Sequence, residues 1–442
     1  MLLYATYIKC SRSLLHRPIK SFVTSKAFSL LVIAFGLSLI QPVHAETIFQ
    51  VISSAQKSHP AVTGADKLAK AADADRKEAF SGYFPTVALE GNAGFRERNE
   101  SEGSNGSTAD LGVTLSQPLF DGFQTKNRVA AADAARDVAG FEIETRQVRV
   151  GLDAATVYLD VLRTSEIAAA ANRYKAQVDG VLAKLNQRAA ADSGLRAQVT
   201  LGQAQQLEAA LAAVAARTQN QLAGAQFMEV VGYKPNRLAG VSLKNLHLPK
   251  SATSALQLGT TSHPALKAAA SEIRKQKGLY GSARSDLFPK VDLVGRAELG
   301  QDLNDVEGRT HSVFGGVRLT YKFATGGGEH YRTRSAEYRL DAATDEEREI
   351  QMKVRRQVLD AWAGWQIASE SYALVAQRRN KSRQILSDYQ GQFDAGKREL
   401  LDFFFVLSQQ YDAEKAEIDA RYNNLLSAFQ LLAAMGTIPT AG

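Results

Sequence analysis

The stretch of sequence that decides the fold is Phe84-Pro85-Thr86-Val87-Ala88-Leu89-Glu90-Gly91. It recurs 204 residues later as Phe288-Pro289-Lys290-Val291-Asp292-Leu293-Val294-Gly295. Further matches share this offset: Ser58-His59-Pro60-Ala61 with Ser262-His263-Pro264-Ala265, Leu115 and Gly122 with Leu319 and Gly326, and Val231-Gly232 with Met435-Gly436. Matches at one offset along the whole chain indicate an internal duplication, so the two halves should be equivalent structural units.

Apolar and polar residues alternate in this stretch and in its surroundings. The sequence predicts four strands, over residues 86–97, 109–118, 290–300 and 312–323. In the first, Val87, Leu89 and Phe95 share one face, and Glu90 and Asn92 share the other. About 9–11 residues with a period of two is typical of membrane-spanning strands. A hairpin packed on a soluble core has the same pattern, so the strands alone leave both interpretations open.

The remaining residues of each half predict an opening helix, near residues 47–80 in the first half, and two very long helices. The long helices are expected over 122–189 and 196–231 in the first half, and over 327–393 and 399–436 in the second. Their apolar residues repeat at alternating steps of four and three, which predicts coiled-coil packing. At 1.5 Å per residue the first helix would span about 100 Å. An isolated coiled-coil stalk would share these features.

The sequence therefore predicts an α+β fold that is mostly α, with an internal two-fold repeat. The expected divisions are a signal peptide (1–45), a first repeat (46–232), a linker or equatorial segment (233–261), a second repeat (262–436) and a C-terminal tail (437–442).

Residues 1–45 have the organisation of a secretory signal peptide. They contain five basic and no acidic residues, then an apolar core over 28–40, and end in Val43-His44-Ala45. Cleavage after Ala45 would lower the formal net charge from +7 to +2, which leaves little reason to expect a nucleic-acid partner. It would also remove Cys10, the only cysteine, as suits export to an oxidising compartment. An uncleaved membrane anchor is the alternative.

Four strands cannot form a closed sheet in a membrane. An open edge would leave unpaired backbone groups in hydrocarbon, and single-chain barrels begin at about eight strands. Strands that span an outer membrane therefore require an oligomer. Its long helices would then form a tube on the same axis.

The motifs resemble those of the TolC family of outer-membrane channels. The resemblance rests on the paired F-P-x-V strands, the strand-to-helix junction Gln117-Pro118-Leu119-Phe120-Asp121-Gly122 and the segment Gly396-Lys397-Arg398-Glu399-Leu400-Leu401-Asp402. It implies a homotrimer with a 12-stranded barrel in outer-membrane lipid and a 12-helix periplasmic tunnel. It also implies a periplasmic adaptor and an inner-membrane pump such as an ABC transporter. The last segment is most similar to the agglutination-protein branch, the exit ducts for type I secretion of large adhesins.

The resemblance also implies a gate at the periplasmic helix tips. Asp402 and Arg398 match the family's tip aspartate and arginine. Two other family positions differ: Phe405 replaces a second aspartate, and Thr200 replaces the aspartate that can pair with the arginine. Phe403-Phe404-Phe405 could line the gate or pack the helices. The helix-hairpin tips expected to dock an adaptor carry Asp192, Gly194, Arg196, Asp394, Gly396 and Lys397.

No motif predicts an enzyme, a cofactor or a metal site. The histidines beyond residue 45 lack metal-ligand spacing, and Gly326-Gly327-Gly328 lacks the ending of a phosphate-binding loop. The expected function is therefore passive export through an outer-membrane duct of a tripartite type I secretion system. A multidrug efflux duct is the alternative, and a non-channel periplasmic stalk is a third interpretation.

Overall fold

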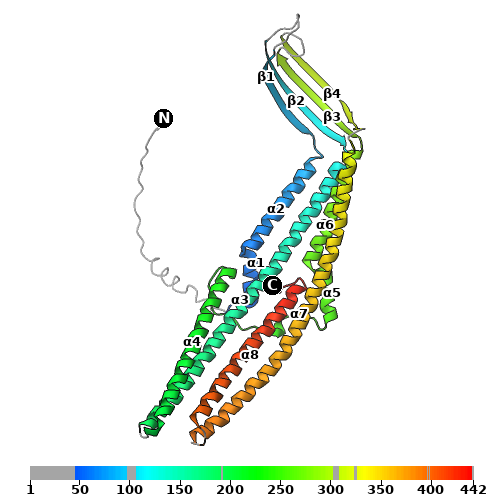
Figure 1. The fold of residues 1–442 in the computed structure, drawn as a ribbon. Helices are drawn as coiled ribbons and strands as arrows, with labels where there is room; N and C mark the ends of the chain where they lie inside the picture. The colour runs from blue at the N-terminus through cyan, green and yellow to red at the C-terminus, as the bar shows by residue number, and fades with distance from the viewer. Residues whose placement is uncertain are drawn as a thin grey trace, which may run out of the picture. The chain divides into compact units, whose positions relative to one another are not determined.

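The two halves of the chain fold in the same way (Figure 1). The computed structural model describes residues 45–440, except 97–105, 191–192, 302–307, 323–325, 396 and 398. The elements of the first half are α1 (Ile48–Ser58), α2 (Pro60–Ser81), β1 (Thr86–Arg96), β2 (Gly106–Phe120), α3 (Gln124–Ala189) and α4 (Arg196–Val231). Those of the second half are α5 (Ala252–Ser262), α6 (Pro264–Arg284), β3 (Lys290–Gln301), β4 (Arg309–Thr320), α7 (Gly328–Asp394) and α8 (Leu400–Ala434).

Five of the six pairs of equivalent elements begin 204 residues apart, which confirms the duplication. The expected signal peptide lies outside the described residues, apart from Ala45.

The opening helix of each half is divided in two, unlike the single helix expected from the sequence. His59 ends α1 and begins α2, because Pro60 has no backbone N–H to continue the first helix. The second half repeats this break at His263-Pro264. All of helix α5 except its last residue, Ser262, lies inside the segment 233–261 assigned to the linker, so the connection between the halves is shorter. Ser251 starts this helix with a capping box to Ser254.

The strands form one antiparallel sheet in the order β1-β2-β3-β4. Directly opposite residues of antiparallel strands point to the same face. The register aligns Leu89 with Val113, Val113 with Ala297, and Ala297 with Val313. One face is thus apolar across all four strands, and it is open: Leu89 is 68% exposed and Val313 84% exposed.

The opposite face of the sheet is polar. Asn92 donates to Asp110 across β1 and β2 at 3.0 Å, and Arg296 lies 3.4 Å from Glu298 on β3. The predicted two-faced strands are therefore present, and none of the helices that the structure describes packs on their apolar face to form a soluble core (Figure 1).

The helices lie side by side in a fixed order below the sheet (Figure 1). Next to the sheet, α2 contacts α3, α3 contacts α6, and α6 contacts α7. Toward the hairpin tips, α4 contacts α3, α3 contacts α8, and α8 contacts α7. Helix α3, with 66 residues, belongs to both rows: the upper layer next to the sheet and the lower layer toward the hairpin tips. In the described part of the chain, no helix is both long and apolar enough to cross a membrane.

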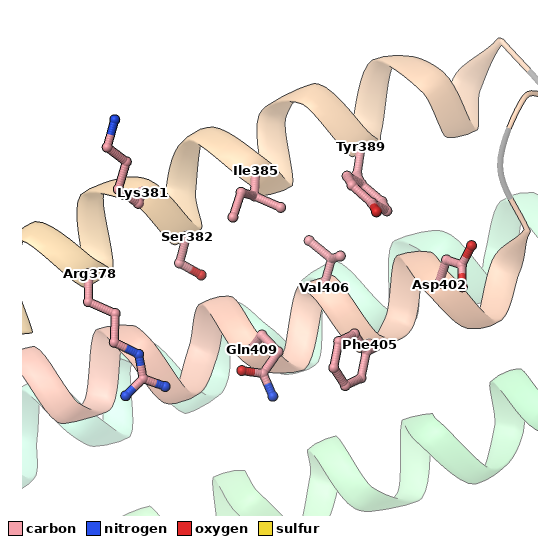
Figure 2. Close-up of a pocket in the computed structure, with 9 residues that line it drawn as sticks. All are labelled: Arg378, Lys381, Ser382, Ile385, Tyr389, Asp402, Phe405, Val406 and Gln409. Carbon is pink, nitrogen blue, oxygen red and sulfur yellow. The ribbon is translucent and has the colours of Figure 1, made fainter.

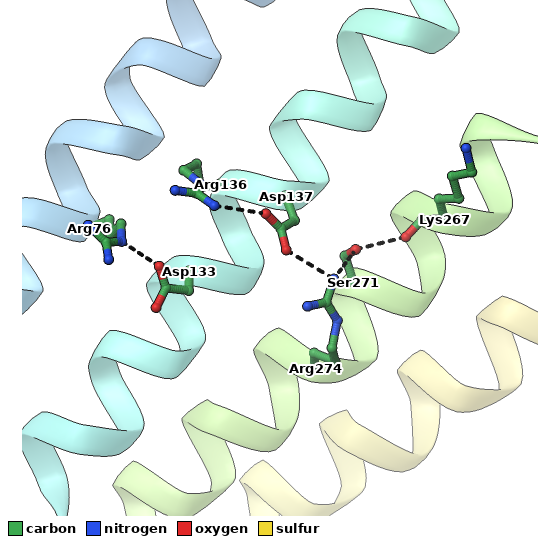
Figure 3. A network of polar contacts seen from close by, with 7 residues as sticks. All are labelled: Arg76, Asp133, Arg136, Asp137, Lys267, Ser271 and Arg274. Carbon is green, nitrogen blue, oxygen red and sulfur yellow. Dashed lines mark hydrogen bonds and ion pairs between the residues drawn. The ribbon is translucent and has the colours of Figure 1, made fainter.

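Polar contacts join α2, α3 and α6 in the part of the helices next to the sheet (Figure 3). Arg76 of α2 pairs with Asp133 of α3, while Arg274 of α6 lies 3.1 Å from Asp137 of α3. Arg274 also donates to the hydroxyl of Ser271, a side chain only 1% exposed. The network orients three helices where the chain leaves the sheet.

The segment after α4 binds the start of the described chain through hydrogen bonds. Glu46 forms a parallel bridge with Leu238, and the Tyr158 hydroxyl lies 2.7 Å from the carbonyl oxygens of both Glu46 and Ala239. The Glu46 carboxylate accepts a hydrogen bond from the Tyr233 hydroxyl. Burial, and then this hydrogen bond, raise the pKa of Tyr233 to about 12.

Gly122 forms the corner between β2 and α3. Its φ is +68°, and a Cβ at this position would lie 2.6 Å from the carbonyl oxygen of Ser285. The equivalent Gly326 has a φ of +67°, but a Cβ there would meet no atom of the described residues within 4 Å. The two corners share a backbone conformation and differ in their packing.

We expect Gly122→Ala to destabilise the protein more than Gly326→Ala. Both place an L-residue in the left-handed region, at about 1–2 kcal/mol, but only Gly122→Ala adds an overlap, typically about 1–3 kcal/mol. Thermal unfolding of the detergent-solubilised variants, followed by circular dichroism, measures the difference. Equal midpoints for the two variants would contradict the close packing at Gly122.

Candidate functional site

The seam between α3 and α8 joins the two helix hairpins, and polar pairs line its upper part. Arg163 of α3 lies 2.8 Å from Asp419 of α8, and Arg173 lies 2.7 Å from Glu414. Glu166 pairs with Arg421 and also accepts a hydrogen bond from the Tyr422 hydroxyl at 2.6 Å.

Burial, followed by the bond to the Glu166 carboxylate, raises the pKa of Tyr422 well above its usual range. The charged side chains of this ladder are partly exposed, and exposed ion pairs contribute only about 0–1 kcal/mol each. The polar ladder therefore serves mainly to set the register of α8 on α3.

The lower part of the seam is apolar. Tyr174 of α3 stacks on Tyr411 of α8 with ring centroids 4.9 Å apart. Nearer the tip the apolar cluster extends to α7, where Phe393 stacks on Phe403 of α8 at 4.8 Å. Phe404 packs in the same cluster and is only 2% exposed. The structure thus places two of the three consecutive phenylalanines in helix packing.

Phe405, 63% exposed, lies instead with Asp402 on a groove between α7 and α8 (Figure 2). Ile385 and Tyr389 point from α7 toward α8, and Val406 points back toward them. The groove encloses about 590 Å³. Its other lining residues are Arg378, Lys381, Ser382 and Gln409. A carboxylate and cationic side chains thus occupy one surface close to a helix tip.

The structure places the other tip residues as follows. Thr200 is exposed on α4, is not part of this groove, and donates to the Arg196 carbonyl at 3.2 Å. Gly194 lies in a 3-10 turn, Asp394 is the last residue of α7, and the Lys397 amide donates to the Gln392 carbonyl. The positions predicted at Asp192, Gly396 and Arg398 lie outside the described residues.

The flanking helices expose a second apolar stripe that the sequence analysis did not separate from the core. On α4, Gly202, Ala209 and Ala216 are buried, whereas Leu207 and Leu211 are 67% and 69% exposed. Helix α7 likewise exposes Met352, Ile367, Leu374 and Ile385. The heptad spacing shows that a helix has apolar sides, but it does not tell which side meets a helix of the same chain.

The site offers no arrangement suited to metal chemistry. Among the side chains placed by the structure, no group of three His, Cys, Asp or Glu residues could hold a metal ion.

Comparison with known proteins places the chain in a family. A family model described as "Outer membrane efflux protein" matches residues 51–232 and 255–437. The outer membrane efflux protein BepC of Brucella suis is 27% identical over 75% of this chain and 72% of its own. The outer membrane protein TolC of Vibrio cholerae is 24% identical over 91% of this chain and 93% of its own.

The fold is shared with solved channel structures. The CmeC outer membrane channel of Campylobacter jejuni has a TM-score of 0.76 over 87% of this chain and 84% of its own, at 16% identity. The family model matches once in each half of the duplication and covers most of the sequence. The chain therefore belongs to the outer membrane efflux protein family of TolC-like channels, which are placed in the outer membrane with a tunnel that extends into the periplasm.

Proposed function

We propose that the protein is the outer-membrane exit duct of a tripartite type I secretion system that exports a large protein, such as an adhesin. It acts as a homotrimer with a periplasmic adaptor and an inner-membrane ABC transporter, which supplies the energy. The observation that carries the duct is the four-stranded sheet with one exposed apolar face. The tip sequence Gly396–Asp402 supports the type I assignment.

The sheet supports a trimer because β1 and β4 are its edges. In lipid, each edge must pair its backbone groups with another strand. Three copies joined edge to edge would supply twelve strands. The continuous apolar face would then meet the lipid, and the polar face would line the interior.

The helices support the same ring. Helices α4 and α7 are the two outer members of the lower layer, and both expose apolar stripes. Leu207–Leu222 on α4 lie about 15–40 Å from the adjoining tip, and Ile367 and Leu374 on α7 lie about 30–40 Å from it, at 1.5 Å per residue. The α4 stripe of one copy can therefore pack on the α7 stripe of the next.

We expect the detergent-extracted protein to have a native mass of three chains. Leu211→Glu should shift it to smaller species, because it places a carboxylate in the α4–α7 contact. Gln219→Glu adds the same charge at an exposed position on α4 outside the stripe and is the matched control. Analytical ultracentrifugation of the outer-membrane extract gives the masses. A wild-type protein released without detergent as a monomer would contradict the duct and favour a periplasmic stalk.

The tip of α8 supports a gate. Three copies would bring three Asp402 carboxylates toward one axis, together with the exposed Phe405 side chains. A carboxylate ring at a constriction attracts cations and repels anions. Arg398 and Thr200 are proposed members of this gate, and the tip residues Asp192, Gly194, Arg196, Asp394, Gly396 and Lys397 are proposed adaptor contacts.

We expect Asp402→Ala to raise the single-channel conductance and to reduce block by divalent cations. Asp402→Glu keeps the charge and should retain the block of the wild type. Recordings in planar bilayers with and without divalent cations measure both properties. If the alanine variant conducts and is blocked as the wild type is, Asp402 does not belong to the gate.

The cargo has a second candidate, small toxic molecules. The family description and the name of BepC both specify efflux, which favours a multidrug pump as the partner.

For the proposed type I secretion duct, we expect a deletion strain to lose a secreted surface protein while its drug susceptibility stays the same. Measuring both in one strain separates the cargoes: increased drug susceptibility with normal secretion would select efflux.

A further inference from the structure

The repeated Ser-His-Pro-Ala motif places a histidine at the same joint in both halves. His59 links α1 to α2, and His263 links α5 to α6, with no other residue between the helices. In each case the imidazole Nδ1 accepts a hydrogen bond from the backbone N–H two residues later, Ala61 or Ala265, at 3.2 Å. Each histidine is therefore the N-cap of the second helix.

This cap works only while the imidazole is neutral. A protonated imidazole has N–H groups at both nitrogens and cannot accept the amide hydrogen bond. It would also place a positive charge at the positive end of the helix dipole. Because histidine titrates near neutral pH, such a cap is lost under mild acid.

The two joints differ in their surroundings. In the second half the end of α8 covers the histidine: a Cβ at Gly436 would lie 2.9 Å from the His263 Cα. In the first half the equivalent Gly232 has nothing within 4 Å of such a Cβ among the described residues. The duplication thus keeps both caps but packs only His263 against the C-terminal end of α8.

His263 also lines an open pocket of about 330 Å³ between α3, α6, α7 and α8. Helix α3 contributes Arg149, the one charged side chain among the lining residues, and α7 and α8 contribute Gln357 and Gln430. The rest of the lining is Thr145, Val148, Leu152, Pro264, Ala433, Ala434 and Gly436. No lining residue carries a carboxylate that could stabilise an imidazolium, and Arg149 would oppose it.

We propose that His263 is an acid-sensitive cap, whose protonation releases the start of α6 and loosens the joint between α5, α6 and the end of α8. Burial lowers the pKa of His263, in agreement with this environment. The unfolded chain then binds a proton more readily than the folded one, so stability is complete above the unfolded pKa of about 6.5 and declines as the pH falls below it. The proposal does not depend on the cargo or on the channel function.

The experiment compares the thermal midpoint of the full-length detergent-solubilised protein at about pH 7.5 and about pH 5.5, on either side of the histidine pKa. His263→Asn keeps a neutral cap that does not titrate. We expect its midpoint to fall by about 1–2 °C less than that of the wild type, the size of change that one lost cap produces in a chain of this length. His263→Ala should be less stable at both values, with a small pH dependence.

His59→Asn is the matched control at the more exposed of the two joints, where we expect a smaller change in pH dependence than for His263→Asn. A local readout does not require any variant to fold. Hydrogen exchange of the wild type, corrected for the intrinsic rate, should lose protection at α5–α6 in acid before it does at α1–α2. The proposal is overturned if wild type and His263→Asn lose stability in parallel, or if the two joints lose protection together.

Discussion

A strand that faces lipid must have backbone partners on both edges, and this constraint governs the rest of the molecule. One chain supplies an antiparallel sheet of four strands whose apolar face is exposed from β1 to β4. The apolar face of such a sheet meets the lipid, so it does not need to be covered by helices. The helices instead continue away from its lower end, so that the long helices form a strip in which they lie side by side (Figure 1).

Within this strip, α3 is the shared element. It contacts α2 and α6 below the sheet and then α4 and α8 toward the tips. The change of neighbours explains why its apolar residues are not confined to one side, and why the contacts change in chemistry along its length. Polar pairs fix the register with α8 near Arg163 and Glu166, and aromatic packing around Phe403 and Phe404 follows near the tip.

The duplication reproduces backbone geometry more faithfully than it reproduces packing. Gly122 and Gly326 share a left-handed conformation, as do Gly232 and Gly436. Among the described residues, only one member of each pair packs closely against another segment: Gly122 against Ser285, and Gly436 against His263. Both halves retain the backbone conformation of these glycines, whereas the segments that pack against them depend on where each half lies in the strip.

The sequence by itself determined the duplication, the four two-faced strands and the very long helices, because these depend on local periodicity and on proline and glycine positions. It did not reveal the break at His59-Pro60, since proline is accepted at the first position of a new helix. Only the tertiary structure decided which apolar stripe of each helix is buried within the chain, as it did for Phe403, Phe404 and Phe405. Three adjacent identical residues carry no information on their neighbours; the apolar cluster that α8 forms with α3 and α7 buries two of them, and the third lies in the groove.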